Sequence, residues 1–201
     1  MTPLVILGAG GHAKPVIETL RAMGMEPVGV LDDAPRGVVL GIAQLGTLAD
    51  LPRFAGQAAA IAIGDNATRA RLGQACRDAG IALPALVHPG AIVSPTAVIE
   101  AGAQVMARAA IGAEARIGRL ALVNTGAIVE HDCVLEEAAH LGPGAVLCGF
   151  VRLGARALVG AGAVVRPGVA IGADATVAPG AAVAEAVAEG ARVGGVPAKP
   201  I

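Results

Sequence analysis

An aliphatic residue recurs at every sixth position through the second half of the chain, and this repeat restricts the fold more than any other feature. From Val87 to Val183, each sixth residue is Val, Ile or Leu without an interruption. A period of six is a multiple of the two-residue repeat of a strand, but not of the 3.6-residue repeat of a helix. The pattern therefore predicts short strands, separated by tight turns and stacked as a solenoid.

A second position in the repeat is restricted to small residues. The residue two places before each aliphatic is Ala, with Cys133, Val151 and Val169 as the exceptions. We expect the aliphatic side chain to fill the interior, while the small residue lets the neighbouring face approach. Three segments then make one three-sided coil of about 18 residues. An ordinary sandwich of short strands would not keep this phase for so long.

The first half of the chain alternates short apolar runs with helical stretches. We expect strands at 3–7, 28–31 and 59–63 and helices at 13–23 and 66–78, the second capped by Asn66. This alternation is typical of a parallel sheet with crossover helices. Because ligands bind at the carboxyl ends of such strands, a site is expected from the side chains that follow them, namely His12, Asp32, Asp33 and Asn66.

The glycine-rich turn after the first strand is similar to a dinucleotide-binding fingerprint. Gly8, Gly10 and Ala13 fit the pattern G-x-G-x-x-A, and Asp32 follows about 20 residues later. However, the unit has only about 80 residues, roughly half of a full dinucleotide fold, and no domain for hydride chemistry follows it. A mononucleotide or sugar nucleotide is therefore favoured over NAD and over a purely structural turn, since a helix N-terminus suits an anionic ligand.

Composition excludes several other functions. The formal net charge is −1 and there is no Trp or Tyr, so the chain lacks the basic field and the aromatic platforms of nucleic-acid-binding proteins. The first apolar run is too short for a signal sequence or a membrane span. Cys76, Cys133 and Cys148 lack the spacing of a zinc site, which favours a reducing compartment. We expect a cytoplasmic protein with no membrane insertion and no nucleic-acid partner.

Two histidines of the repeat region raise the question of chemistry. His131 is followed by Asp132, and His140 lies half a coil further on. Both could be ordinary surface histidines, but a neighbouring carboxylate can orient an imidazole and stabilise its cation. Histidines of such a coil can also bind a metal, as they do in the trimeric gamma-type carbonic anhydrases. No third ligand has a matching spacing, so we expect no metal.

Four stretches together resemble one family. They are GAGGHAKPVIETLRAMG (8–24) with LDD (31–33), AIGDN (62–66), NTGAIVEHDCVLEEAAHLGPGAVLCG (124–149) and GGVPAK (194–199). Over essentially the whole chain, they are similar to the PglD/NeuD-type sugar acyltransferases of the hexapeptide-repeat superfamily. Within that group, the resemblance is closest to N-acetyltransferases of UDP-4-amino-trideoxy sugars or of GDP-perosamine.

This resemblance implies the domain organisation and the handedness of the coil. It implies a Rossmann-like α/β domain at 1–84 that binds the sugar nucleotide, a left-handed parallel β-helix at 85–187 with acyltransferase activity, and a C-terminal tail at 188–201. It also implies a homotrimer with active sites between subunits, and acetyl-CoA as the co-substrate.

The resemblance implies roles for individual residues as well. His131 would be the general base that takes a proton from the sugar amine, and Asp132 would orient it. The sugar nucleotide would be bound by Gly11, His12, Asp32, Asp33, Asn66 and Asn124. Acetyl-CoA would be contacted by His140 and by the main chain at Gly149 and Ala161.

Two other functions remain open from the sequence. A hydroxyl acceptor in place of the amine would make the chain an O-acetyltransferase of sialic acid or of another sugar. A chain without activity would be a trimeric scaffold in which the coil is only a spacer, and it would not bind acetyl-CoA.

Overall fold

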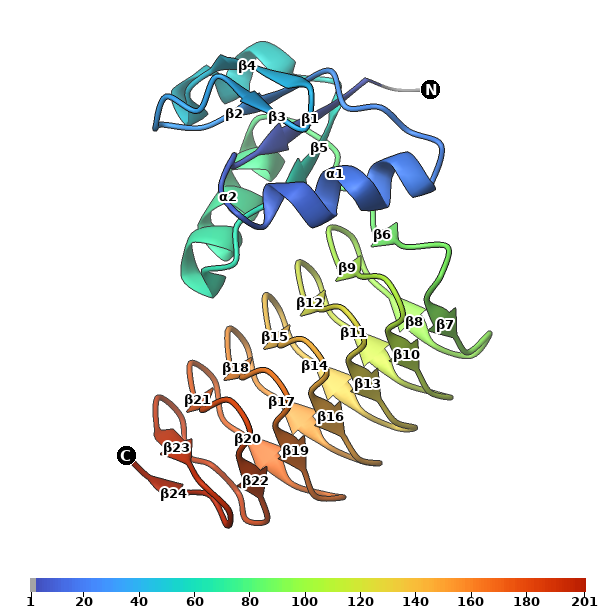
Figure 1. The fold of residues 1–201 in the computed structure, drawn as a ribbon, viewed down its shortest axis with the longest axis vertical. Coiled ribbons are helices and arrows are strands. Elements are labelled where there is room, and N and C mark those ends of the chain that lie inside the picture. Colours follow the sequence, from blue (N-terminus) through green and yellow to red (C-terminus); the bar gives the residue numbers. More distant parts are fainter. Residues whose placement is uncertain (1–2) are drawn as a thin grey trace.

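The computed structural model describes residues 3–201 as a small α/β unit on one end of a long coil (Figure 1). The sheet of this unit has the order β3-β4-β2-β1-β5, and β1 pairs in parallel with both β2 and β5. Its strands are β1 (Leu4–Leu7), β2 (Gly29–Leu31), β3 (Val38–Val39), β4 (Ile42–Gly46) and β5 (Ala58–Ile61).

Helices cover both faces of this sheet. Helix α1 (Ala13–Ala22) buries Val16, Ile17 and Leu20 against one face. Helix α2 (Asn66–Asp78) and the 3₁₀ helix η1 (Leu48–Phe54) cover the other face. The parallel sheet between two helical layers confirms the Rossmann-like α/β fold predicted for this part of the chain.

Two details of this unit differ from the sequence-based expectation. The cap of α2 is Asp65 and not Asn66, because the Asp65 carboxylate accepts a hydrogen bond from the Thr68 N–H at 2.8 Å. The antiparallel pair of β3 and β4 was not expected. Its turn places Leu40 and Gly41 in the left-handed region, with φ of 47° and 86°.

The coil consists of short parallel strands in three sheets, named here sheets I, II and III. Sheet I contains β7 (Ile92–Val93), β10 (Ala110–Ile111), β13 (Ile128–Val129), β16 (Val146–Leu147), β19 (Val164–Val165) and β22 (Ala182–Val183). Sheet II contains β8 (Val98–Ile99), β11 (Arg116–Ile117), β14 (Val134–Leu135), β17 (Arg152–Leu153) and β20 (Ala170–Ile171).

Sheet III contains β6 (Leu86–Val87), β9 (Gln104–Val105), β12 (Leu122–Val123), β15 (His140–Leu141), β18 (Leu158–Val159), β21 (Thr176–Val177), β23 (Arg192–Gly194) and the antiparallel β24 (Lys199–Pro200). Successive strands of each sheet are one coil apart, as in the pairing of Ala110 with Ile128. The second part of the chain is thus a left-handed parallel β-helix.

Both restricted positions of the repeat lie inside the coil. Leu141, Leu147 and the small Ala139 are fully buried there. Cys133 occupies a small-residue position in the same core, so its thiol serves packing. Since the interior repeats from coil to coil, residues of the same size recur at the same place, which explains the unbroken period.

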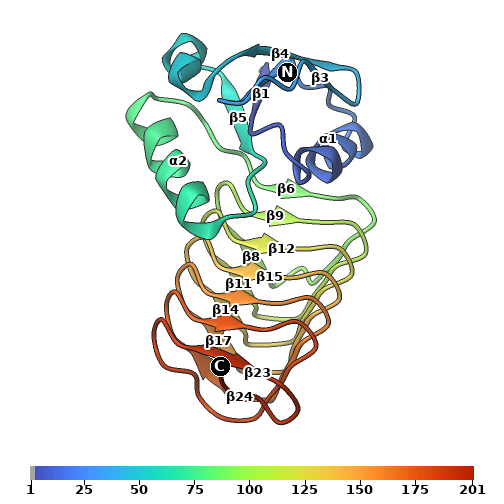
Figure 2. The same cartoon turned by 60° about the vertical axis from the view of Figure 1, so that its left-hand side comes forward.

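The α/β unit rests on sheet III. Helix α1 lies over β6 (Figure 1), and α2 reaches down beside the following coils (Figure 2). Leu120 and Ala138 of the coil share a buried cluster with Leu72 and Cys76 of α2. None of the helices in residues 3–201 is long and apolar enough to cross a membrane.

Candidate active site

His131 lies in the turn after β13, at the corner between sheets I and II. Its Nδ1 is 2.9 Å from Oδ2 of Asp132, and 52% of its side chain is exposed. An ionised carboxylate only accepts hydrogen bonds, so Nδ1 carries the proton and the lone pair lies on Nε2. The pair is therefore arranged as an oriented base with its basic nitrogen accessible.

Gly149, one coil further on, lies against the imidazole of His131. A Cβ at this position would be 2.6 Å from Cε1 and 2.7 Å from Nε2 of the ring. Gly149 is buried, yet within residues 3–201 its backbone N–H donates to no other group. A free donor beside a base is the arrangement that acyl transfer requires, because the carbonyl oxygen becomes negative in the transition state.

Asn124 and His140 meet at a different corner of the coil. Asn124 follows β12, His140 projects from β15, and the Asn124 Nδ2 lies 3.2 Å from the His140 Nε2. The pKa of His140 is lowered from 6.5 to about 4, mainly by burial and in smaller part by the nearby positive charge of Arg69. His140 is therefore neutral at pH 7 and accepts a hydrogen bond from the Asn124 amide. The structure brings these two predicted site residues together with each other, but not with His131.

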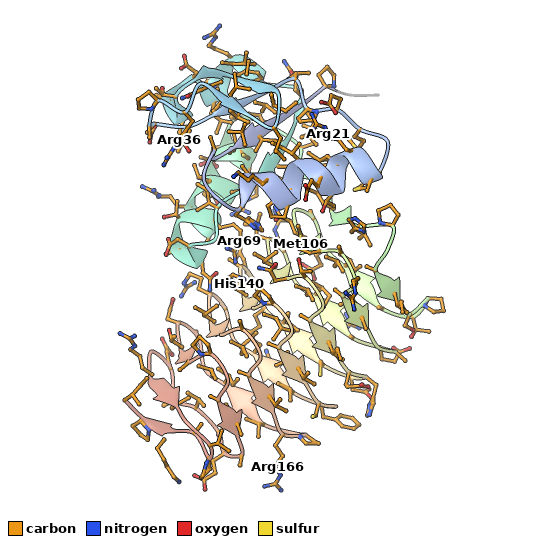
Figure 3. All side chains as sticks on the ribbon, in the orientation of Figure 1. Arg21, Arg36, Arg69, Met106, His140 and Arg166 are labelled. Atoms are coloured by element: carbon orange, nitrogen blue, oxygen red, sulfur yellow. The ribbon has the colours of Figure 1, made fainter. Side chains whose placement is uncertain are left out.

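Arg69 of α2 is the centre of the junction between the two units and was not identified from the sequence. It is 1% exposed and donates to the carbonyl oxygens of Leu120, Ala138, Ile63 and Gly64. Burial lowers the pKa of its guanidinium to about 10. Figure 3 shows Arg69 and His140 close to each other where the α/β unit meets the coil.

Asn66, which we expected to bind substrate, also belongs to this junction. Its Oδ1 accepts a hydrogen bond from Arg69, and its amide donates to the Arg156 carbonyl at 2.7 Å. Both ends of the side chain are thus engaged within the protein. The rule that strand ends carry ligands placed Asn66 correctly at the edge of the sheet, but there it contacts the coil.

The carboxylates that follow β2 fix the backbone of neighbouring segments. Asp32 accepts hydrogen bonds from the N–H groups of Ala9 at 2.7 Å and Ala34 at 2.8 Å. Asp33 accepts one from Leu48 at 3.0 Å. Asp32 therefore fixes the backbone just before the exposed Gly11, whereas Asp33 fixes the start of η1.

His12 faces the coil. Its Nε2 lies 3.0 Å from Oε1 of Gln104 in β9, and the Gln104 amide donates to the Ile61 carbonyl at 2.8 Å. Burial lowers the pKa of His12, partly opposed by the hydrogen bond with Gln104. The neutral imidazole thus links the glycine-rich turn to sheet III.

An open hollow of about 480 Å³ adjoins the glycine-rich turn. Gly10, Gly11 and Lys14 line one side, and Arg36 with residues 38–40 lines the other. Two cations beside the N-terminus of a helix suit the phosphates of a nucleotide. Lys14 and Arg36 were missed from the sequence, because Arg36 reaches the turn only through the unexpected β3–β4 pair.

Ala161 lies in the turn after β18 and is exposed. Like Gly149, it has a backbone N–H that donates to no other group of the described residues.

No cluster of three or more His, Cys, Asp or Glu side chains in residues 3–201 is arranged to hold a metal ion.

Comparison with known proteins adds to this geometry. The family described as PglD N-terminal domain matches residues 3–75, and the family described as hexapeptide repeat of succinyl-transferase matches residues 150–185. The comparison with curated proteins finds no match.

Solved structures are similar over the whole length. A variant of perosamine N-acetyltransferase from Caulobacter crescentus, with one histidine replaced by Asn and with CoA and GDP-perosamine bound, is 45% identical. The match covers 100% of this chain and 97% of that chain, with a TM-score of 0.97. The acetyltransferase domain of PglB from Neisseria gonorrhoeae, in complex with acetyl coenzyme A, is 37% identical, with coverages of 100% and 99% and a TM-score of 0.96.

The fold, the His131–Asp132 pair and the similarity over the full chain agree with one another. The chain belongs to the PglD-type sugar N-acetyltransferases of the hexapeptide-repeat superfamily.

Proposed function

We propose that this enzyme transfers the acetyl group of acetyl-CoA to the 4-amino group of a nucleotide-activated amino sugar, either GDP-perosamine or a UDP-4-amino-trideoxyhexose. The observation that carries the proposal is the His131–Asp132 pair against Gly149, a residue whose backbone N–H has no partner in residues 3–201. It is supported by the similarity to an enzyme that was solved with CoA and GDP-perosamine.

The proposed reaction uses His131 as the base. The amine nitrogen attacks the thioester carbonyl, so that a C–N bond forms while the Nε2 of His131 takes a proton from the nitrogen. Asp132 accepts a hydrogen bond from Nδ1–H of the imidazole, which keeps its proton, and stabilises the cation that forms. The C–S bond then breaks, and CoA leaves with a proton from the imidazolium. No covalent enzyme intermediate is needed.

The free N–H groups of the coil are proposed to bind the acetyl donor. Gly149 lies beside His131 and would donate to the carbonyl oxygen as it becomes negative. Ala161 would donate to the pantetheine arm. His140 and Asn124 lie apart from His131 in one subunit, so they would line the approach to the reacting groups from a neighbouring subunit, with the neutral imidazole held by the Asn124 amide.

The sugar nucleotide is proposed to bind in the hollow beside the glycine-rich turn. Lys14 and Arg36 would neutralise the charge of the two phosphates. Gly11 and His12 lie where the turn meets the helix, and Asp32 fixes the turn through Ala9. Asp33 would contact the sugar nucleotide from the end of β2. The hollow lies in the α/β unit, so the sugar would extend from it toward the coil.

A homotrimer is proposed because sheet I presents an apolar outer surface next to His131. The outward residues of this sheet are Ile92, Ala110, Ile128, Val146, Val164 and Ala182. An aliphatic surface of this kind is typical of a subunit interface. Packing of sheet I against another copy would bring a second subunit to the exposed side of His131.

A cytoplasmic location is proposed because acetyl-CoA is a cytoplasmic metabolite.

The experiment that tests the function measures CoA release from acetyl-CoA with a panel of acceptors. The panel contains a UDP-4-amino-trideoxyhexose, GDP-perosamine, a dTDP-4-amino sugar and free sialic acid. We expect turnover with a 4-amino nucleotide sugar and none with sialic acid. Turnover with sialic acid alone would change the assignment to O-acetylation. No acetyl-CoA binding by calorimetry would favour the scaffold.

A further inference from the structure

The side chain of Phe150 does not pack in the core, and its turn does not require an aromatic residue. The chain contains only 2 Phe and no Trp or Tyr, yet Phe150 is 62% exposed. Its backbone is left-handed, with φ of 63°, a conformation in which a bulky side chain is an outlier. Gly168 takes the same place in the next coil with φ of 73°. An aromatic residue kept in a strained and exposed position points to a role in function.

The ring of Phe150 lies against the imidazole of His131. The two ring centroids are 5.1 Å apart and the ring planes are at 88° to each other, which is an edge-to-face contact between aromatic rings. The backbone N–H of Phe150 also donates to the His131 carbonyl at 3.1 Å. The two turns are therefore connected both through the backbone and through the side chains.

Three residues restrain the imidazole from different directions. Asp132 holds Nδ1, and Gly149 lies against the edge formed by Cε1 and Nε2. One hydrogen bond at Nδ1 leaves the ring free to tilt about that atom. A second ring at a right angle opposes the tilt. Since a small displacement of a reacting group can cost a large part of the rate, this restraint matters for a base.

We propose that Phe150 is a positioning residue, which holds the imidazole of His131 so that Nε2 is directed at the acceptor amine. The proposal rests on the role of His131 as the base. Phe150 acts through His131 and does not itself exchange a proton or bind the acetyl group.

The test compares F150G, F150Y and F150L with the parent enzyme. Glycine removes the ring and relieves the left-handed backbone, so F150G should fold at least as well as the parent. Tyrosine keeps the aromatic contact, whereas leucine keeps only the apolar character. The matched control is E114G, because Glu114 takes the same turn position two coils earlier, with φ of 59° and an exposed side chain.

We expect F150G to lower kcat by about 10-fold, with the KM for acetyl-CoA within twofold and an altered pH dependence of kcat. F150Y should stay within threefold of the parent, F150L should resemble F150G, and E114G should match the parent. F150G with unchanged kcat and pH profile, or F150L as active as the parent, would overturn the proposal. Dissociation of the assembly by F150G in sedimentation would also overturn it, since the ring would then be a subunit contact.

A second readout separates this proposal from the proposed function. NMR coupling constants of labelled histidine should show one rotamer of His131 in the parent and several in F150G, without any substrate. An inactive parent enzyme would refute the proposed function and leave this readout intact. An active parent with the same single rotamer in F150G would refute the positioning role alone.

Discussion

Gly149 leaves space for the imidazole of His131, because a Cβ on Gly149 would lie 2.6 Å from the ring. The displaced group in G149A would be the end of a side chain, which can move without disturbing the backbone. We therefore predict that G149A keeps the thermal stability of the parent but loses about 10- to 100-fold in kcat, since the base is misplaced. Steady-state kinetics and thermal melting check this.

Gly154 provides the contrast. A Cβ there would be 2.6 Å from the Ala173 nitrogen and 2.7 Å from the Gly172 carbon, both in the backbone of the next coil. We predict that G154A costs about 1–3 kcal/mol of stability by overpacking, while kcat of the folded protein is retained. Equal effects of the two substitutions on kcat would contradict a specific role for the space at Gly149.

Arg69 is predicted to be the strongest single link between the α/β unit and the coil. In R69M the carbonyls of Leu120 and Ala138 lose their buried donor, which should lower the free energy of unfolding by about 2–4 kcal/mol. Arg77 of the same helix is the control. Its ion pair with Glu137 spans 3.7 Å at the surface, so R77M should change stability by less than about 1 kcal/mol. Urea unfolding measures both, and similar losses would contradict the assignment.

His140 should make the protein less stable in mild acid. The folded pKa is lowered from 6.5 to about 4, mainly by burial and also by the charge of Arg69. Between these values the unfolded chain binds the proton more readily, so stability falls as pH decreases. From pH 7 to pH 5 this residue should account for a loss of about 1–2 kcal/mol.

The variant H140Q isolates this contribution, because glutamine can accept the Asn124 hydrogen bond and does not titrate. Its unfolding free energy should depend less steeply on pH than that of the parent. Some dependence should remain, since the pKa of His12 is also lowered. An unchanged slope in H140Q would show that His140 is not the group responsible.

A substitution at Val164 tests the proposed homotrimer. Val164 projects from sheet I with 43% exposure, whereas Val98 projects from sheet II with 44% exposure. A buried charge at a subunit interface is costly, so V164E should sediment as a monomer and lose activity, while V98E should behave as the parent. A parent enzyme that is itself a monomer, or a V164E variant of unchanged size, would contradict the proposed trimer.

The coil was predictable because its structure repeats in the sequence. Each interior side chain packs against its equivalent one coil away, which restricts its size and polarity. The aliphatic and small residues therefore recur at a fixed spacing. The strands of the α/β unit were predictable from local patterns. The β3–β4 pair was not, because Val38 and Val39 are too few to form a pattern and the turn depends on the left-handed backbone of Leu40.

The candidate site was predictable where its residues are adjacent in sequence. His131 and Asp132 are neighbours, so their hydrogen bond could be anticipated. Arg69 is buried only because two units meet around it, and no local pattern distinguishes it from an exposed arginine. Phe150 reaches His131 through the stacking of coils, which a search for polar residues overlooks.

His131 is proposed to be the base of an acetyl transfer to a 4-amino nucleotide sugar. The most direct test measures kcat for CoA release with that acceptor in the parent and in H131A, with circular dichroism and sedimentation as controls. We predict that H131A loses about 10²–10⁴ in kcat with its fold and assembly unchanged. A folded, correctly assembled H131A within threefold of the parent would contradict the account.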